Sequence, residues 1–245
     1  RIESSAASDV YKRQEVASEI LKETADRIIP CHFELGGKSA AIIYPDADID
    51  KAVDSTVKGI FKPNAGQICV AMSRVIIHPK VKDEYMSKLI VKTKELKIGS
   101  GADNNTDVTP LISKEQMQRV SNYVKSGIQS GAELTIGGKE SENKEGNFYQ
   151  PTIFDNVKTD STIAQEEIFG PVTSVFDFKD EEEAIDIANS TNYGLASGVF
   201  TSDDQKAKWT AERIQAGVIW HNDWFVDGTN LPGGGYKRSG YGRDG

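Results

Sequence analysis

Apolar residues along this chain switch repeatedly between helical spacing and short continuous runs. Val16, Ile20 and Leu21 recur at helical spacing, which predicts a helix from Glu15 to Ile28. Pro30 then ends that helix, because proline has no N–H to donate. Short runs with strand character follow at residues 31–35, 40–44, 75–77, 172–178, 196–201 and 218–220.

Helical patterns separate most of these runs. Asp48 is a predicted N-cap for a helix whose apolar side includes Val53 and Ile60. Further helices are predicted near residues 81–90, 113–130, 181–189 and 203–214, and loops at 99–110, 137–147 and 233–245. Because strands and helices alternate, we expect an α/β fold, a mostly parallel twisted sheet with flanking helices.

Composition excludes several classes of function. The chain has 245 residues, a net charge of −8 and a pI of about 5.1. Its lysines alternate with acidic residues, so nucleic acid is not an expected partner. We expect no membrane span, because no apolar run approaches the roughly 18 residues needed, and no signal peptide. Cys31 and Cys69 cannot form a disulfide framework, so a reducing cytoplasm is the expected location.

Cys69 is the leading candidate for a chemical role because of its surroundings. It ends the string Gly66-Gln67-Ile68-Cys69 and precedes Val70-Ala71, where the sequence predicts a helix start. N–H groups at a helix start lower the pKa of a thiol. Glu34 supplies a carboxylate earlier in the chain, in Glu34-Leu35-Gly36-Gly37-Lys38. A thiol and a general base together suit acyl-thioester chemistry; a small buried residue and a salt-bridged carboxylate are the alternatives.

These two strings, with Glu166-Glu167-Ile168-Phe169-Gly170-Pro171, resemble the aldehyde dehydrogenase superfamily. The resemblance implies that Cys69 is the catalytic nucleophile and that Glu34 activates the water that hydrolyses the thioester. It also implies cofactor contacts for Gly36, Glu167 and Phe169, in which Glu167 holds the nicotinamide ribose and Phe169 packs beside it. The alternative for the last string is an acidic turn followed by a core phenylalanine.

The sequence departs from the family pattern at two places. The segment Phe61-Lys62-Pro63-Asn64-Ala65 is one residue longer than the common pattern, which a local bulge can absorb. Gly233, in a string that resembles a family PFGGxKxSG tail, stands where an aromatic residue is usual, so no substrate specificity is inferred. Asn222 resembles a family asparagine near the substrate mouth, and we expect it to contact substrate.

The resemblance implies oxidation of an aldehyde to a carboxylic acid with NAD or NADP, through a cysteine thiohemiacetal and thioester. It begins at about Glu15 and covers the C-terminal half of such an enzyme. Residues 1–14 are therefore expected to be a non-family segment, residues 15–36 the end of the cofactor-binding domain, and residues 37–245 the catalytic domain. The chain alone is expected to be inactive, and the full-length enzyme a homo-oligomer.

Other functions remain open at this stage. The chain can be a truncated subunit that folds without catalysing a reaction, or a thiol-dependent esterase that needs Cys69 but no hydride acceptor. A CoA-acylating relative is disfavoured because Glu34 is present. Gly36-Gly37-Lys38-Ser39 ends like a phosphate-binding loop, but His32 occupies the required earlier glycine position. The scattered histidines predict no metal site.

Overall fold

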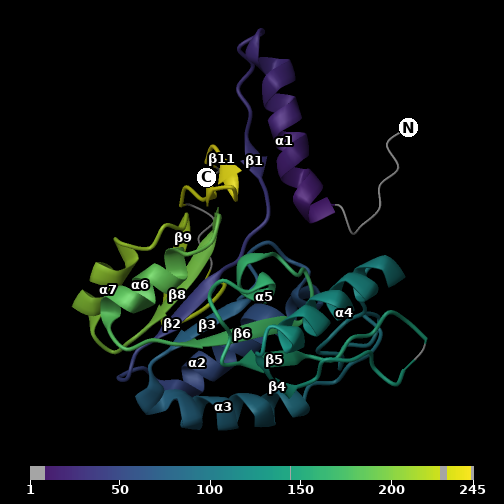
Figure 1. Cartoon of the computed structure of the whole chain (residues 1–245), viewed down its shortest axis with the longest axis vertical. Coiled ribbons are helices and arrows are strands. Elements are labelled where there is room, and N and C mark those ends of the chain that lie inside the picture. The colour runs from purple at the N-terminus through teal and green to yellow at the C-terminus, as the bar shows by residue number, and fades with distance from the viewer. Residues whose placement is uncertain (1–8, 144, 227–230, 244–245) are drawn as a thin grey trace.

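A seven-stranded sheet forms the centre of this computed structural model, which describes residues 9–143, 145–226 and 231–243 (Figure 1). The strand order is β4-β5-β6-β3-β2-β8-β9, and only the β4–β5 pair is antiparallel. This confirms the predicted α/β fold with a mostly parallel sheet. The strands are β2 Ala40–Ile43, β3 Arg74–Ile77, β4 Glu133–Ile136, β5 Thr152–Asp155, β6 Val172–Asp177, β8 Ala196–Phe200 and β9 Val218–His221.

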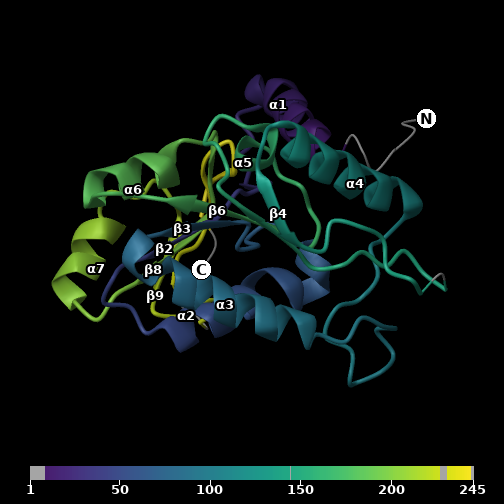
Figure 2. The same ribbon diagram turned by 60° about the horizontal axis from the view of Figure 1, so that its bottom comes forward.

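Helices cover both faces of the sheet, with α2 and α3 on one side and α4 and α6 on the other (Figure 2). The predicted N-cap at Asp48 is confirmed, because its carboxylate accepts a hydrogen bond from the Lys51 N–H (3.1 Å).

Among the described residues, no helix combines the length and the apolar character that a membrane span requires. The helices are α1 Asp9–Ala25, α2 Ile49–Thr56, α3 Pro79–Lys94, α4 Lys114–Gln129, α5 Thr162–Gln165, α6 Glu181–Asn189 and α7 Asp204–Ala211.

The central strands are mostly apolar because helices shield both of their faces. Every residue of β2, β3 and β8 is buried. Arg74, at the start of β3, is the charged exception, and its guanidinium donates to the carbonyls of Lys38 (2.9 Å), Ile187 (2.7 Å) and Ala188 (2.8 Å). This side chain therefore ties the loop before β2 to the end of α6.

Two short antiparallel ribbons lie outside the main sheet. The sequence predicts only one of their four strands, at residues 31–35. β1, Phe33–Glu34, pairs with β11, Gly240–Tyr241, and β7, Tyr193–Gly194, pairs with β10, Tyr236–Lys237. The prediction that the tail from Gly233 is all loop is therefore wrong, because its backbone forms these two-residue pairings. β4 and β5 are absent from the predicted strands because neither contains a long apolar run. Leu134 and Ile136 alternate with polar residues on β4, and β5 has only Ile153 and Phe154.

Helix α1 stands away from the sheet with its apolar side uncovered (Figure 1). Val16, Ile20 and Leu21 are exposed by 52%, 42% and 42%, whereas Ala17 on another side is buried. The helix begins at Asp9, six residues before the predicted start, and ends at Ala25. Residues 1–8 of the predicted non-family segment lie outside the described part of the chain. The predicted helical pattern is thus present, but its apolar residues Val16, Ile20 and Leu21 stay exposed.

Candidate active site

The loop between β1 and β2 contacts two of the predicted site residues, Glu167 and Cys69. The Gly37 N–H donates to Glu167 Oε1 (3.2 Å). A side chain at Gly36 would collide with the Glu167 carboxylate, and one at Gly37 would collide with the Cys69 carbonyl. Because only glycine lets the backbone approach this closely, the paired glycines bring the cysteine loop and Glu167 to the same place.

The cysteine loop has an unusual backbone. A π-helical turn, η2 Val57–Phe61, follows α2 and leads into the short 3-10 segment η3 Pro63–Gly66. Asn64, Ala65 and Gly66 then take positive φ values of 50°, 51° and 73°. A π turn holds one more residue than an α turn, and η2 overlaps the segment from Phe61 to Ala65 at Phe61. That a bulge absorbs the additional residue of this segment stays a prediction.

Val70 and Ala71 do not begin a helix, so the predicted helix-start environment of Cys69 is wrong. Residues 69–70 form a turn, and the chain then enters β3 at Arg74. The pKa of the Cys69 thiol is raised by burial first and then by the negative charges of Glu167 and Glu34. The N–H groups of Cys69 and Val70 act in the opposite direction without overcoming these effects. The thiol therefore rests protonated at neutral pH.

Glu34 lies on the ribbon formed by β1 and β11. Gly240 is its partner in the pairing, and the Leu35 N–H donates to the Ser239 carbonyl (3.0 Å). The carboxylate is half-exposed, and its Oε1 lies 3.6 Å from His32 Nε2. Its charge acts on Cys69, but the part of the chain that the structure describes shows no hydrogen bond between the two side chains. Glu34 is therefore a solvent-accessible carboxylate beside the thiol loop.

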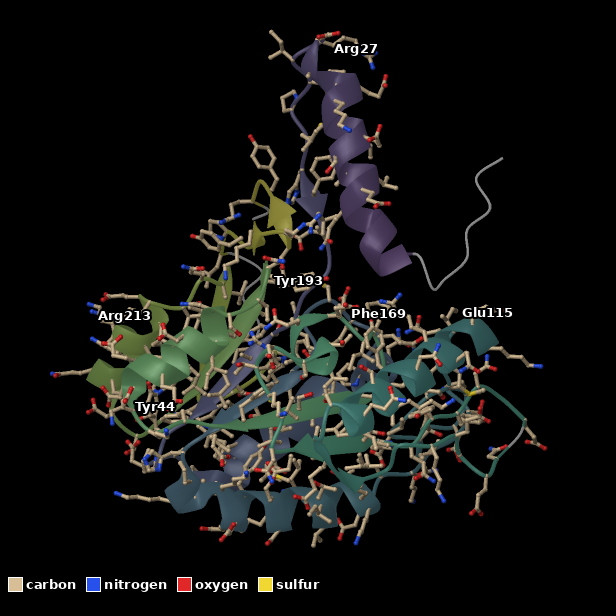
Figure 3. All side chains as sticks on the ribbon, viewed as in Figure 1. Arg27, Tyr44, Glu115, Phe169, Tyr193 and Arg213 are labelled. Atoms are coloured by element: carbon tan, nitrogen blue, oxygen red, sulfur yellow. The ribbon has the colours of Figure 1, made fainter. Side chains whose placement is uncertain are left out.

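Glu167 and Phe169 belong to a tight turn between α5 and β6. Glu167 is 4% exposed, and Phe169 has a left-handed φ of 59°. A cavity of about 300 Å³ opens beside this turn and is lined by Glu167, Tyr193 and Arg238, among others. Figure 3 shows Tyr193 and Phe169 on the side of the body that faces α1. Glu167 is the predicted site residue that lines this cavity.

Lys38 is a buried charge that the sequence analysis did not assign to the site. Its side chain is 2% exposed, and its Nζ has no hydrogen-bond partner among the described residues. Burial lowers the pKa of Lys38 to about 7, and the charge of Arg74 adds to that effect, whereas Glu167 and Glu166 oppose it. Lys38 is thus a lysine that loses its proton near neutral pH.

Asn222 follows β9 and has a left-handed φ of 55°. Its side-chain amide accepts from the Thr201 N–H (3.0 Å) and donates to the Thr201 carbonyl (2.8 Å). These bonds tie the end of β9 to the end of β8. The structure does not bring this amide into contact with Cys69 or Glu167 among the described residues, and its substrate contact stays a prediction.

The sequence analysis missed two further residues at the site. Trp224 is fully buried and its indole N–H donates to the Val70 carbonyl (3.2 Å), next to Cys69. Gln116 is 2% exposed and contacts the turn that contains Phe169. Gln116 stands three residues after Ser113, a spacing that predicts a capping-box role. The sequence therefore explains this glutamine by its position in the helix and gives no sign of its contact with the distant turn. The described residues include no group of three or more histidine, cysteine or acidic residues that could hold a metal.

The chain is similar in sequence to known aldehyde dehydrogenases. A model described as the aldehyde dehydrogenase family matches residues 13–245. Betaine aldehyde dehydrogenase of Bacillus subtilis is 41% identical over 233 residues, which cover 94% of this chain and 47% of that protein. Aldehyde dehydrogenase family 2 member B4, mitochondrial, of Arabidopsis thaliana is 45% identical over 215 residues, covering 88% and 40%.

Solved structures give the same result. Betaine aldehyde dehydrogenase of Staphylococcus aureus in complex with NAD+ matches with a TM-score of 0.90 and 39% identity, covering 94% of this chain and 46% of that one. An NAD-dependent aldehyde dehydrogenase of Sinorhizobium meliloti matches with a TM-score of 0.90 and 37% identity, covering 94% and 45%. The chain spans about half the length of the curated relatives it matches.

Proposed function

We propose, because this chain belongs to the aldehyde dehydrogenase family, that it carries the catalytic cysteine, the general base and the nicotinamide-side contacts of a longer enzyme. That enzyme oxidises an aldehyde to a carboxylic acid with NAD+ or NADP+. One observation carries the proposal: Gly36 and Gly37 lie between the Glu167 carboxylate and the Cys69 backbone. The domain limits follow the sequence analysis, with residues 15–36 ending the cofactor domain and 37–245 forming the catalytic domain.

The first chemical step belongs to Cys69. Its thiol loses a proton, and the sulfur adds to the aldehyde carbonyl to form a thiohemiacetal. The new oxyanion needs hydrogen-bond donors in a site that excludes water. The Cys69 N–H, which already lies close to the sulfur, is one such donor. The raised pKa of the thiol means that this step needs a base or a change of environment when substrate binds.

The remaining steps use the two glutamates. Glu167 is buried and held by the Gly37 N–H, so its carboxylate is fixed where it can bind the nicotinamide ribose, and Phe169 packs beside it. When bound, NAD+ or NADP+ would supply the hydride acceptor for oxidation of the thiohemiacetal to the thioester. Glu34 then takes a proton from the water that hydrolyses the thioester, and its half-exposed position gives it access to that water.

The described residues fit only the nicotinamide end of a dinucleotide. Glu167 and the cavity of about 300 Å³ beside it provide one polar contact and space for a ring. Phosphate binding in such folds uses the N-terminus of a helix that follows a glycine-rich turn. We place that part of the enzyme before Glu15. Cytoplasmic location and homo-oligomeric assembly of the longer enzyme are further parts of this proposal.

The role of Glu34 is tested by Glu34→Gln in the longer enzyme. A base needed only for water attack leaves acylation intact, so the initial burst of reduced cofactor persists while steady-state turnover falls by about 10²-fold or more. Stopped-flow absorbance of the reduced nicotinamide measures both phases. Glu166→Gln is the matched control, since its carboxylate instead accepts from the Tyr123 hydroxyl (2.7 Å). Loss of the burst in Glu34→Gln alone contradicts the assignment.

Two alternatives are favoured by specific observations. The uncovered apolar side of α1 is what a non-catalytic fragment of a longer protein would present. A thiol-dependent esterase needs Cys69 and Glu34 but no hydride acceptor, and both residues lie in the described chain. Hydrolysis of p-nitrophenyl acetate without cofactor separates these two: Cys69-dependent turnover supports the esterase, and its absence supports the non-catalytic fragment.

A further inference from the structure

One face of helix α4 contacts the turn that contains Glu167 and Phe169. The Gln116 side-chain amide donates to the carbonyls of Ile168 (3.1 Å) and Phe169 (2.8 Å), and Arg119 donates to the carbonyl of Glu167 (3.2 Å). Residues three apart lie on the same side of a helix. Three successive carbonyls of the turn are therefore held from a single helix face.

The segment just before Gln116 holds the cysteine loop in the same way. Gln67 is 5% exposed; its side-chain carbonyl accepts from the Ile112 N–H (2.9 Å), and its amide donates to the carbonyl of Asn64 (2.8 Å). Ser113 then caps α4 by accepting from the Gln116 N–H (3.1 Å). We call residues 110–116 the bracket, because they contact the cysteine loop through Gln67 and begin the helix that contacts the cofactor turn through Gln116.

The cysteine loop and the Glu167 turn, which the bracket joins, also contact each other directly. A side chain at Gly66 would collide with the Gly170 carbonyl, so the cysteine loop and the Glu167 turn are packed backbone to backbone. Phe169 keeps a left-handed φ of 59°, which a non-glycine residue adopts only when its surroundings impose it. Gln116 helps to hold this backbone conformation, because its amide donates to the carbonyls of Ile168 and Phe169. Without that amide the two carbonyls lose a buried donor.

We propose that Gln116 is a positioning residue that fixes the Glu167–Phe169 turn against the cysteine loop, and that Gln67 is its counterpart on the thiol side. The proposal rests on the proposed function, because it takes Glu167 and Phe169 as the nicotinamide-side contacts. The bracket sets the distance between the position of the nicotinamide and the thiol. Gln116 does this through the backbone carbonyls of the turn, without touching the reacting atoms.

The first test is hydrogen exchange of the purified chain, read by mass spectrometry. Gln116→Leu removes both donors at nearly constant volume, and we expect amide exchange in residues 167–170 to rise on the order of tenfold. Gln118→Leu is the matched control, because Gln118 lies on the same helix but bonds only to Asn122 at the surface (2.9 Å). Equal exchange in the two variants overturns the proposal.

The second test separates positioning from general stability. In the longer enzyme we expect Gln116→Leu to raise the KM for NAD+ about tenfold, a loss of the size that one removed pair of hydrogen bonds produces. The rate of Cys69 alkylation should stay within the range of Gln118→Leu, whereas the Tm should fall by about 2–4 °C or more because two carbonyls lose their donor. Faster exchange with an unchanged KM shows a purely structural role and overturns the positioning claim. Absence of turnover with both NAD+ and NADP+ in the wild-type enzyme refutes the proposed function instead. The hydrogen-exchange result then tests only whether Gln116 fixes the Glu167–Phe169 turn.

Discussion

At the residue scale, the site is governed by carboxylates close to a thiol. Cys69 is half-buried, and the charges of Glu167 and Glu34 raise the pKa of its thiol in addition to the effect of burial. Glu167 is buried and hydrogen-bonded to Gly37, whereas Glu34 is half-exposed. Because a buried charge is screened less than an exposed one, Glu167 exerts the larger electrostatic effect of the two.

Alkylation of Cys69 therefore depends on Glu167. The rate of iodoacetamide labelling should rise about tenfold per pH unit below the thiol pKa, because only the thiolate reacts. Glu167→Gln removes a negative charge, so it should accelerate labelling at pH 8 by up to about tenfold. Peptide mapping by mass spectrometry also separates Cys69 from Cys31. Glu166→Gln is the control, and an equal acceleration by that variant would show that the effect is a general loss of charge.

Lys38 makes stability depend on pH. Its pKa falls from 10.5 to about 7 on folding, so between these values the unfolded chain binds more protons than the folded chain. The free energy of unfolding should therefore rise with pH from about 7 upward, by at most about 1.4 kcal/mol per pH unit. Urea titrations of wild type and Lys38→Met between pH 7 and 9 measure this contribution. Lys38→Met should lose that part of the slope, and an unchanged slope contradicts it.

At the element scale, helices α4 and α1 differ in how much of their apolar surface is buried. Helix α4 is fixed by its contacts with the Glu167 turn, and Gln116, Val120 and Val124 are buried along it. Helix α1 has its apolar residues outward, and its buried side includes only Gln14 and Ala17 among the residues whose side chains are described. The amide of Gln14 donates to the Arg238 carbonyl (3.2 Å). Stability of the described chain should therefore depend little on the outer side of α1.

Substitutions on the two sides of α1 test this difference. Ile20→Gln on the outer side should change the free energy of unfolding by no more than about 0.5 kcal/mol, as for exposed sites in general. Ala17→Gln on the inner side should lower it by roughly 1–3 kcal/mol, because the larger side chain does not fit. Chemical denaturation measures both variants. A large loss from Ile20→Gln would show that the outer face is covered in solution.

At the scale of the whole molecule, the chain contains one end of a reaction site. The cysteine loop, the Glu167 turn and the Glu34 ribbon meet at the edge of the sheet where β2 and β3 begin. The chain spans about half of its relatives, and Gln14, on the buried side of α1, lines the cavity beside Glu167. Under the proposed function, we expect further protein of the longer enzyme to complete this site.

The chain alone should show no nicotinamide-dependent dehydrogenase activity. Its contacts reach only one end of a dinucleotide, and a missing oxyanion-hole donor typically costs on the order of 10²–10³ in rate. Calorimetric titration with NAD+ and NADP+ and absorbance at the reduced-nicotinamide band with a panel of aldehydes measure binding and turnover. The Cys69→Ala variant is the control. Turnover that depends on Cys69 would contradict this prediction and require a different cofactor site.

Features that depend on neighbouring residues can be predicted from this amino-acid sequence. The caps at Asp48 and Ser113 and the strands β2, β3 and β8 follow from local hydrogen bonding and from apolar runs buried on both faces. Tertiary structure alone decided the rest. Cys69 lacks the expected helix because the chain turns there to enter β3, and Gln116 bonds to carbonyls 52 and 53 residues away. Such contacts leave no periodic or local signal, because they depend on which loops the packed sheet brings together.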